Sequence, residues 1–263
     1  SYFDSAASDE AHSTTADGYW TLAAVAYYML RNYGSAKVMA EQVSDVRYLG
    51  DYGAATLAEI SYVLGLRSVE AAMSEIERTA ISDAVRQLSS FVEGRDDERP
   101  DGIFLSLRSA DSPEDSIMSE ALAVVSQIIA DDATRTLMPE YSGSPLSSWV
   151  PYLTSVNPTR LLWPSQVSIG ERGVFKGESA FVQLPTGSGK TKSLELIIRS
   201  LGLRKDDAHT VVIAPLRALC NEVFRDLSAS LDGVARVNLA SDTFEMDEFL
   251  QPAATSGQEV IVC

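Results

Sequence analysis

One short run of residues constrains the fold of this chain more than any other. Residues 184–191 read Leu-Pro-Thr-Gly-Ser-Gly-Lys-Thr, between a β-branched stretch at 179–184 and an amphipathic stretch at 190–201. Glycines between a strand and a helix let the backbone curl, so that successive N–H groups and the positive end of the helix surround a phosphate. This order therefore predicts a phosphate-binding loop at the end of a parallel strand.

The loop assigns roles to its side chains. We expect Lys190 to reach the β- and γ-phosphates of a nucleotide and the Thr191 hydroxyl to take a Mg²⁺ position, which makes these two residues the candidate catalytic pair and Thr191 the candidate metal ligand. The strict pattern has glycine six residues before the lysine, where this chain has Leu184, and the alternative is a chance Gly-rich turn. The other candidate nucleotide-binding residues of the loop are Pro185, Thr186, Gly187, Ser188 and Gly189.

The sequence around the loop predicts an α/β fold. Short β-branched runs at 179–184, 210–214, 235–240 and 259–263 alternate with amphipathic segments at 190–201 and 216–231. Strands separated by helices imply a doubly wound parallel sheet with right-handed crossovers. Residues 165–263 are therefore predicted to form a doubly wound α/β domain that is incomplete at its end.

The preceding residues predict an all-helical domain at 1–140. Apolar residues recur at spacings of three and four, in segments at about 20–30, 35–43, 54–65, 68–92, 113–130 and 132–138. Residues 24–40 are also compatible with a tetratricopeptide hairpin, although no second copy follows at the expected period. The alternatives are a helical bundle and a repeat. Five prolines between 139 and 164 predict a connection at 141–164.

Charge divides the chain in the same way. Residues 1–140 carry 24 acidic and 10 basic side chains, whereas residues 141–263 carry 13 and 11. An acidic surface repels phosphate backbones, so we expect the helical domain to contact a protein rather than nucleic acid. The longest apolar runs are too short to cross a membrane. The two cysteines, Cys220 and Cys263, lack metal or disulfide spacing and favour a cytoplasmic protein.

The loop sequence Pro-Thr-Gly-Ser-Gly-Lys-Thr resembles that of superfamily 2 helicases and translocases. Residues 214–219, Ala-Pro-Leu-Arg-Ala-Leu, resemble motif Ia of that superfamily, and residues 161–166, ending on Gln166, resemble its adenine-reading Q motif. The resemblance is closest to the Ski2-like branch. It implies that residues 165–263 form the first part of a RecA-like P-loop NTPase domain, with ATP and Mg²⁺ as cofactors and adenine recognition by Gln166. It also implies a strand-contacting loop shaped by Pro215 and Arg217 and ATP-driven movement on nucleic acid, with DNA favoured over RNA.

In that branch, the strand matching residues 260–263 leads into motif Ib, and the Walker B motif follows later. Both ends of this chain look like cuts through a longer protein. Asp247 and Glu248 follow no apolar strand and are expected on a solvated helix face. We therefore expect this piece alone to bind ATP weakly at best and not to hydrolyse it at a useful rate.

Residues 18–36 give a second resemblance, to the N-terminal region of bacterial antiphage-defence helicases, especially the helicase subunit of Hachiman-type systems. This resemblance implies a nuclease subunit as the protein partner. A different reading is a nucleotide-responsive switch or scaffold that controls a protein without translocation. A P-loop kinase or small GTPase is disfavoured because Ala-Pro-x-Arg has no role there.

Overall fold

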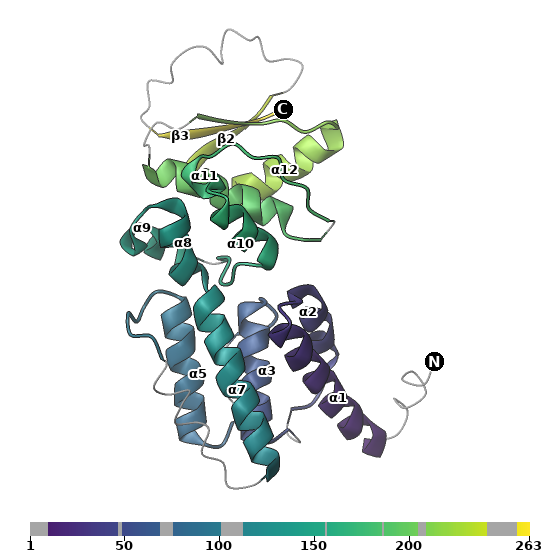
Figure 1. Cartoon of the computed structure of the whole chain (residues 1–263). Coiled ribbons are helices and arrows are strands. Elements are labelled where there is room, and N and C mark those ends of the chain that lie inside the picture. Colours follow the sequence, from purple (N-terminus) through teal and green to yellow (C-terminus); the bar gives the residue numbers. More distant parts are fainter. Residues whose placement is uncertain are drawn as a thin grey trace. The chain divides into compact units, whose positions relative to one another are not determined.

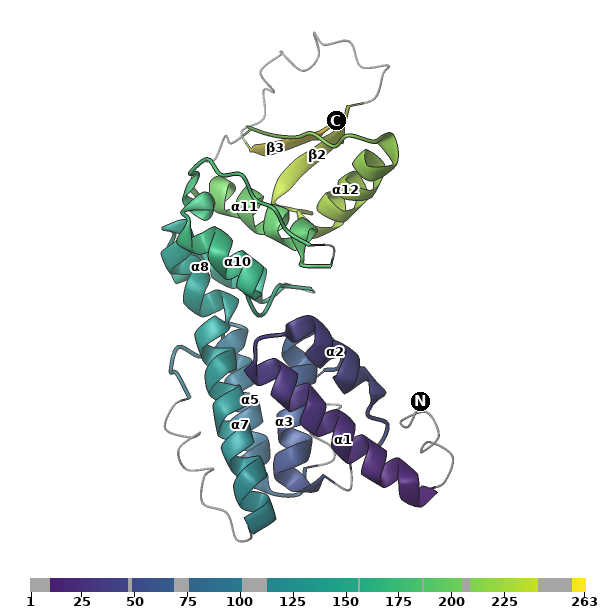
Figure 2. The same cartoon turned by 45° about the vertical axis from the view of Figure 1, so that its right-hand side comes forward.

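The computed structural model describes residues 10–46, 49–68, 76–100, 113–155, 157–185, 187–204, 209–240 and 257–263. The chain divides into two compact units, one of residues 1–137 and 150–164 and the other of residues 138–149 and 165–263. Figures 1 and 2 show both units along the chain. Thr186, Asp247 and Glu248, singled out in the sequence, lie outside the described residues.

The first unit is a helical bundle, as the apolar periodicity predicts. Its helices are α1 (Glu10–Met29), α2 (Tyr33–Gln42), α3 (Gly50–Val63), α5 (Thr79–Val92) and α7 (Pro113–Asp132). Helices α1 and α2 form a hairpin, and α7 packs against α1, α3 and α5 (Figure 2). Every residue from Tyr52 to Val63 is buried, so α3 is the central helix of the bundle.

One predicted helix begins later than expected. The periodicity predicts a helix over 68–92, whereas the described residues 76–78 are not helical and α5 begins at Thr79. The carboxylate of Asp51 accepts hydrogen bonds from the backbone N–H groups of Glu77 (2.9 Å) and Arg78 (3.1 Å). This contact with the start of α3 holds the two residues outside the helix, a restraint that periodicity does not reveal.

Residues 134–153 are more regular than a proline-rich connection would be. They form α8 (Thr134–Ser142) and α9 (Leu146–Leu153), with Pro139 and Pro151 inside these short helices. A proline within a helix removes one backbone hydrogen bond but does not forbid a few turns. The prolines therefore limit helix length here without abolishing helices, and the change from one unit to the other falls within α8 and α9.

The second unit is the predicted α/β domain. It contains α10 (Pro164–Glu171), α11 (Lys190–Arg204), β1 (His209–Val212), α12 (Arg217–Ser230), β2 (Ala235–Leu239) and β3 (Gln258–Val262). The described strands form a parallel sheet in the order β1-β3-β2, with Val211 opposite Ile261 and Val237 opposite Val260. Helix α12 packs against β2, β3 and α11 (Figure 1). These features confirm the RecA-like α/β class.

The prediction of a strand at 179–184, the first of this domain, is wrong. Residues 179–184 belong to no strand, and Phe181 is 96% exposed. A strand is held by hydrogen bonds to a neighbouring strand. In the described sheet β1 pairs with β3 and not with residues 179–184, so a β-branched sequence alone does not make this segment a strand.

No helix in the described part of the chain is both long enough and apolar enough to cross a membrane. The longest described helices are α1 and α7, each of 20 residues. Both belong to the helical bundle, and α7 contributes Leu122, Val125 and Ile129 to its core.

Candidate nucleotide-binding site

The Gly-rich loop adopts the curled shape that its sequence predicts. Gly187 and Gly189 both have a φ of 80°, in the left-handed region that costs other residues about 1–2 kcal/mol. The Ser188 hydroxyl donates a hydrogen bond to the Pro185 carbonyl at 2.7 Å, which closes the turn. Gly187 lies within this turn and Gly189 directly after it, so both left-handed residues come just before the start of α11.

Lys190 and Thr191 are the first two residues of α11, and both are exposed. The first N–H groups of a helix lack intrahelical partners and carry the positive end of its dipole. A lysine ammonium, a hydroxyl and these N–H groups therefore meet at one end of the helix. This set of donors fits a triphosphate with a Mg²⁺ ion whose protein ligand is the Thr191 hydroxyl.

The structure brings Gln166 to this loop although it is 24 residues away in sequence. The Ser165 hydroxyl of α10 donates to the Ser188 carbonyl at 2.9 Å. A Cβ atom added at Gly189 would lie 3.2 Å from the Gln166 side-chain nitrogen. Gln166 is only 2% exposed, so its side chain lies in the packed interior beside Gly189.

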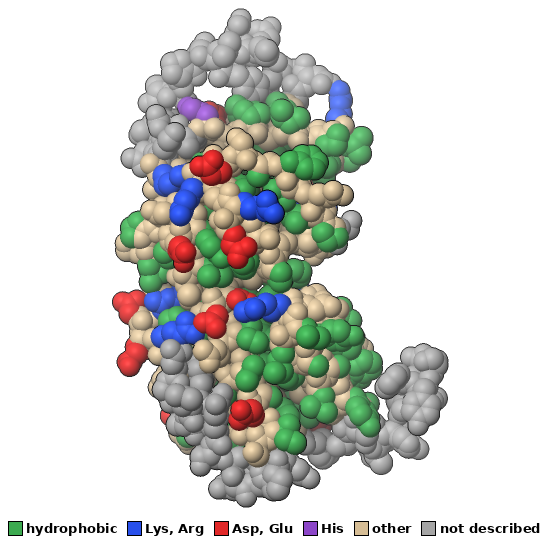
Figure 3. All heavy atoms as spheres, viewed as in Figure 1, with side chains coloured by type: hydrophobic (Ala, Val, Ile, Leu, Met, Phe, Trp, Pro, Cys, Tyr) green, Lys and Arg blue, Asp and Glu red, His purple; other side chains and the backbone are tan. Residues whose placement is uncertain are grey.

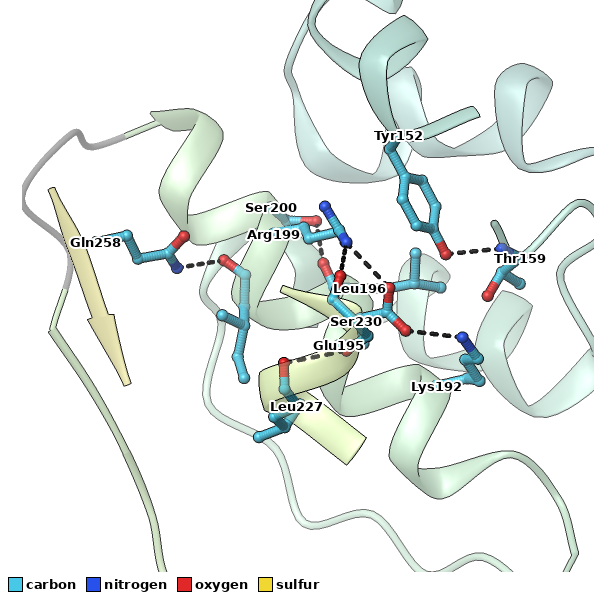
Figure 4. Close-up of polar contacts among 11 residues, drawn as sticks. Tyr152, Thr159, Lys192, Glu195, Leu196, Arg199, Ser200, Leu227, Ser230 and Gln258 are labelled. Carbon is cyan, nitrogen blue, oxygen red and sulfur yellow. Dashed lines mark hydrogen bonds and ion pairs between the residues drawn. The ribbon is translucent and has the colours of Figure 1, made fainter. Parts of the chain in front are cut away.

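Side-chain contacts hold α11, the helix that follows the loop, in place (Figure 4). The sequence motifs do not indicate these contacts. The buried Glu195 carboxylate accepts from the Lys192 ammonium at 3.0 Å and from the Arg199 guanidinium at 3.1 Å. Arg199 also donates to the Ser230 carbonyl at the end of α12. The spacing of Glu195 and Arg199, four residues apart on a helix, is the sequence signal that could have revealed them.

A second contact fixes α11 against the sheet. The Gln258 side chain, at the start of β3, donates to the Ile198 carbonyl at 2.7 Å. A Cβ atom at Gly202 would lie 2.0 Å from the Gln258 side-chain oxygen, so a larger residue there would have to displace the end of this side chain. Both α12 and β3 therefore hold the helix that begins with Lys190, and the loop rests on a rigid support.

Pro215 and Arg217 follow the carboxyl end of β1, and both are exposed. The Ala214 N–H donates to the Cys263 carbonyl at 2.7 Å, which continues the pairing of β1 and β3 to this edge. Helix α12 then begins at Arg217. In open parallel sheets, ligands bind outside the carboxyl ends of the strands, and the structure places both residues there.

The described residues contain no group of three or more histidine, cysteine, aspartate or glutamate side chains that could hold a metal ion. Cys220 and Cys263 are both free thiols. We expect a Mg²⁺ ion at the loop to have the Thr191 hydroxyl as a ligand, together with nucleotide phosphates and water.

Part of the chain that contains this site is similar to a known protein family. Residues 164–262 match the model of the DEAD/DEAH box helicase family. The match begins at α10 and ends in β3, so it includes the loop, Gln166 and the segment after β1. No solved structure was found to match the chain.

Two curated relatives are each similar to a part of the chain. The ATP-dependent DNA helicase Hel308 of Pyrococcus horikoshii is 31% identical over 102 residues, which is 38% of this chain and 13% of that protein. Hel308 of Pyrococcus abyssi is 40% identical over 65 residues, 25% of this chain and 9% of that protein. The chain thus spans a small part of the length of these relatives.

Proposed function

We propose that this chain provides the ATP-binding part of a Ski2-like helicase or translocase that couples ATP hydrolysis to movement on nucleic acid, with DNA favoured over RNA. The observation that carries the proposal is the curled Gly-rich loop at the start of α11, inside a segment that matches a helicase family. Similarity to two DNA helicases supports DNA as the track.

In this proposal the loop N–H groups and the Lys190 ammonium hold the β- and γ-phosphates of ATP. The Thr191 hydroxyl holds Mg²⁺, which neutralises charge that develops on the phosphates. Lys192 does not share the role of Lys190, because its ammonium lies 3.0 Å from the buried Glu195 carboxylate. Hydrolysis also needs a carboxylate that orients water and an arginine that meets the developing charge. We propose that this segment alone lacks them.

The direct test measures phosphate release by the full-length protein with and without single-stranded DNA or RNA of equal length. The proposal predicts ATP turnover that rises on addition of the preferred strand. ATP binding without turnover, unchanged by either nucleic acid, would instead support a nucleotide-responsive switch or scaffold.

Replacing Gln166 by alanine separates two roles for this residue. Because Gln166 is buried beside Gly189, we expect its loss to loosen the loop. The affinity for every nucleotide should then fall by about tenfold, equivalent to about 1.4 kcal/mol. An adenine reader would instead lose only its preference for ATP over GTP. Competition binding with both nucleotides distinguishes the roles, and Gln166→Glu provides a variant of equal size without the amide donor.

Arg217 is proposed to contact the phosphate backbone of the strand on which the protein moves. Its guanidinium is exposed at the carboxyl edge of the sheet, where it can make bidentate contacts with phosphate oxygens. Arg217→Ala is expected to weaken binding to single strands of any sequence and to reduce the salt slope by about 0.7, the value for one phosphate contact on a single strand. ATP binding should not change.

Fluorescence anisotropy at several salt concentrations measures this effect. Arg225, an exposed arginine on the same helix, supplies the matched control, because Arg225→Ala removes an equal charge about two turns further along α12. An equal loss in both variants would show that only net charge matters and would reject a specific contact by Arg217.

The helical unit is proposed to contact a protein, because its sequence is strongly acidic. Its resemblance to antiphage-defence helicases supports a nuclease subunit as that protein and antiphage defence as the context. Co-expression of the full-length protein with a candidate nuclease, followed by size-exclusion chromatography, tests this pairing. Separate elution of the two proteins would reject it.

A further inference from the structure

Helix α1 has apolar residues on two opposite faces, and only one of them is covered. Its inner face, formed by Ala24, Val25 and Tyr28, is buried in the bundle. Its outer face carries Tyr19, Leu22, Ala26 and Met29, at the spacings of three and four that place side chains on one side of a helix. Leu30, directly after the helix, continues this face, and its N–H donates to the Ala26 carbonyl at 3.1 Å. Tyr19 is 61% exposed, Leu22 53%, Met29 42% and Leu30 77%.

The exposed apolar residues of α1 form one continuous patch and are not scattered singly over the surface. Residues 18–30 contain no charged side chain, and hydrophobic side chains gather over α1 in the space-filling view (Figure 3). Single exposed apolar residues are ordinary, but a helix that is apolar all round is normally buried on all sides. The stripe from Tyr19 to Leu30 covers about three turns, roughly 16 Å, the length over which two helices pack.

The stripe is held rigidly at both ends. Near its start, the buried Asp17 carboxylate accepts hydrogen bonds from the backbone N–H groups of Ser44 (3.1 Å) and Asp45 (3.2 Å), which follow α2. Just after its end, the Arg31 guanidinium donates two hydrogen bonds to the Asp132 carboxylate of α7, at 2.7 and 3.1 Å. A preformed surface loses little conformational entropy on binding.

We infer that the outer face of α1 docks an amphipathic helix of another protein, whose apolar face is flanked by lysines and arginines. Charge selects this occupant: residues 1–140 carry 24 acidic against 10 basic side chains, which attracts a basic partner. A second copy of this chain, whose net charge is −16, would approach it against electrostatic repulsion. The inference rests on the proposal that the helical unit contacts a protein, and it does not depend on ATP.

The experiment uses a synthetic helix of about 18 residues, with leucines on one face and lysines along both flanks, and a second peptide with glutamates in place of the lysines. Fluorescence anisotropy measures the binding of each peptide to this chain. The lysine peptide should bind saturably, and the glutamate peptide at least about tenfold more weakly. The variants Leu22→Ser and Leu30→Ser should each weaken binding of the lysine peptide by about tenfold or more, and neither substitution changes the net charge.

Ile213→Ser is the matched control, because Ile213 is an exposed aliphatic residue of the other unit, at 81%. If the lysine peptide still binds both the Leu22→Ser and the Leu30→Ser variant, the outer face of α1 is not the docking surface. A protein contact elsewhere on the helical unit would then remain open. Binding of neither peptide would also overturn this docking surface, whereas the co-expression experiment decides independently whether the helical unit contacts a protein. A wild-type dimer in sedimentation velocity that becomes monomeric in the Leu22→Ser variant would show that a second copy is the occupant and would reject the basic helix.

Discussion

Replacing Lys190 by alanine is expected to lower ATP turnover of the full-length protein by at least about 10²-fold. The ammonium at the start of α11 is proposed to stabilise charge that develops on the β- and γ-phosphates, and loss of one such preorganised donor typically costs about 10² to 10³ in kcat. ATP binding should weaken as well, since a charge-assisted hydrogen bond is lost. Phosphate release under saturating ATP measures the first effect, and equilibrium binding of labelled ATP measures the second.

Lys192 offers the matched control on the same helix. It lies two residues further on, and its ammonium is paired with the buried Glu195 carboxylate instead of standing at the loop. Lys192→Ala should therefore retain most of the turnover. Wild-type turnover in Lys190→Ala, or an equal loss in both variants, would show that the loop does not use Lys190 as proposed.

Replacing Glu59 by glutamine is expected to stabilise the helical unit at alkaline pH by about 3–5 kcal/mol. Burial in the centre of the bundle raises the pKa of Glu59 from its ordinary 4.5 to about 8, although a hydrogen bond with Ser126 opposes the shift. Each pKa unit corresponds to about 1.4 kcal/mol. The folded protein keeps this carboxyl protonated, so the wild-type unit should lose stability as pH rises from about 4.5 to about 8.

A neutral glutamine has no proton to lose and can keep a hydrogen bond to Ser126. Urea unfolding of this chain at pH 5 and pH 8.5 should therefore show the two proteins nearly equal at the lower pH and separated at the higher one. Tyr28, which is buried nearby and whose pKa burial also raises, stays neutral throughout this range. Glu41→Gln, at an exposed position on α2, removes the same formal charge from the surface and serves as the control for net charge. Parallel pH profiles for wild type and Glu59→Gln would contradict the prediction.

The sequence alone was sufficient for features that depend on nearby residues. The loop at 184–191 could be recognised because its glycines, lysine and threonine are consecutive, and two glycines with positive φ are a local requirement of the turn. The division into a helical unit and a parallel α/β unit could also be predicted, because periods of 3.6 and 2 are properties of short segments. The roles of Lys190 and Thr191 remain proposals, although they rest on the same local chemistry.

Tertiary structure decided whatever depends on contacts between distant segments. Residues 179–184 have a strand-like sequence, yet they are not a strand because pairing is a property of two segments. Gln166 lies buried against Gly189 because α10 packs on the loop. The Glu195 and Arg199 pair reaches α12 through Ser230, 31 residues beyond Arg199. The sequence showed that α1 is apolar, but only the packed bundle decided which face is covered, because burial is set by neighbours that no single helix encodes.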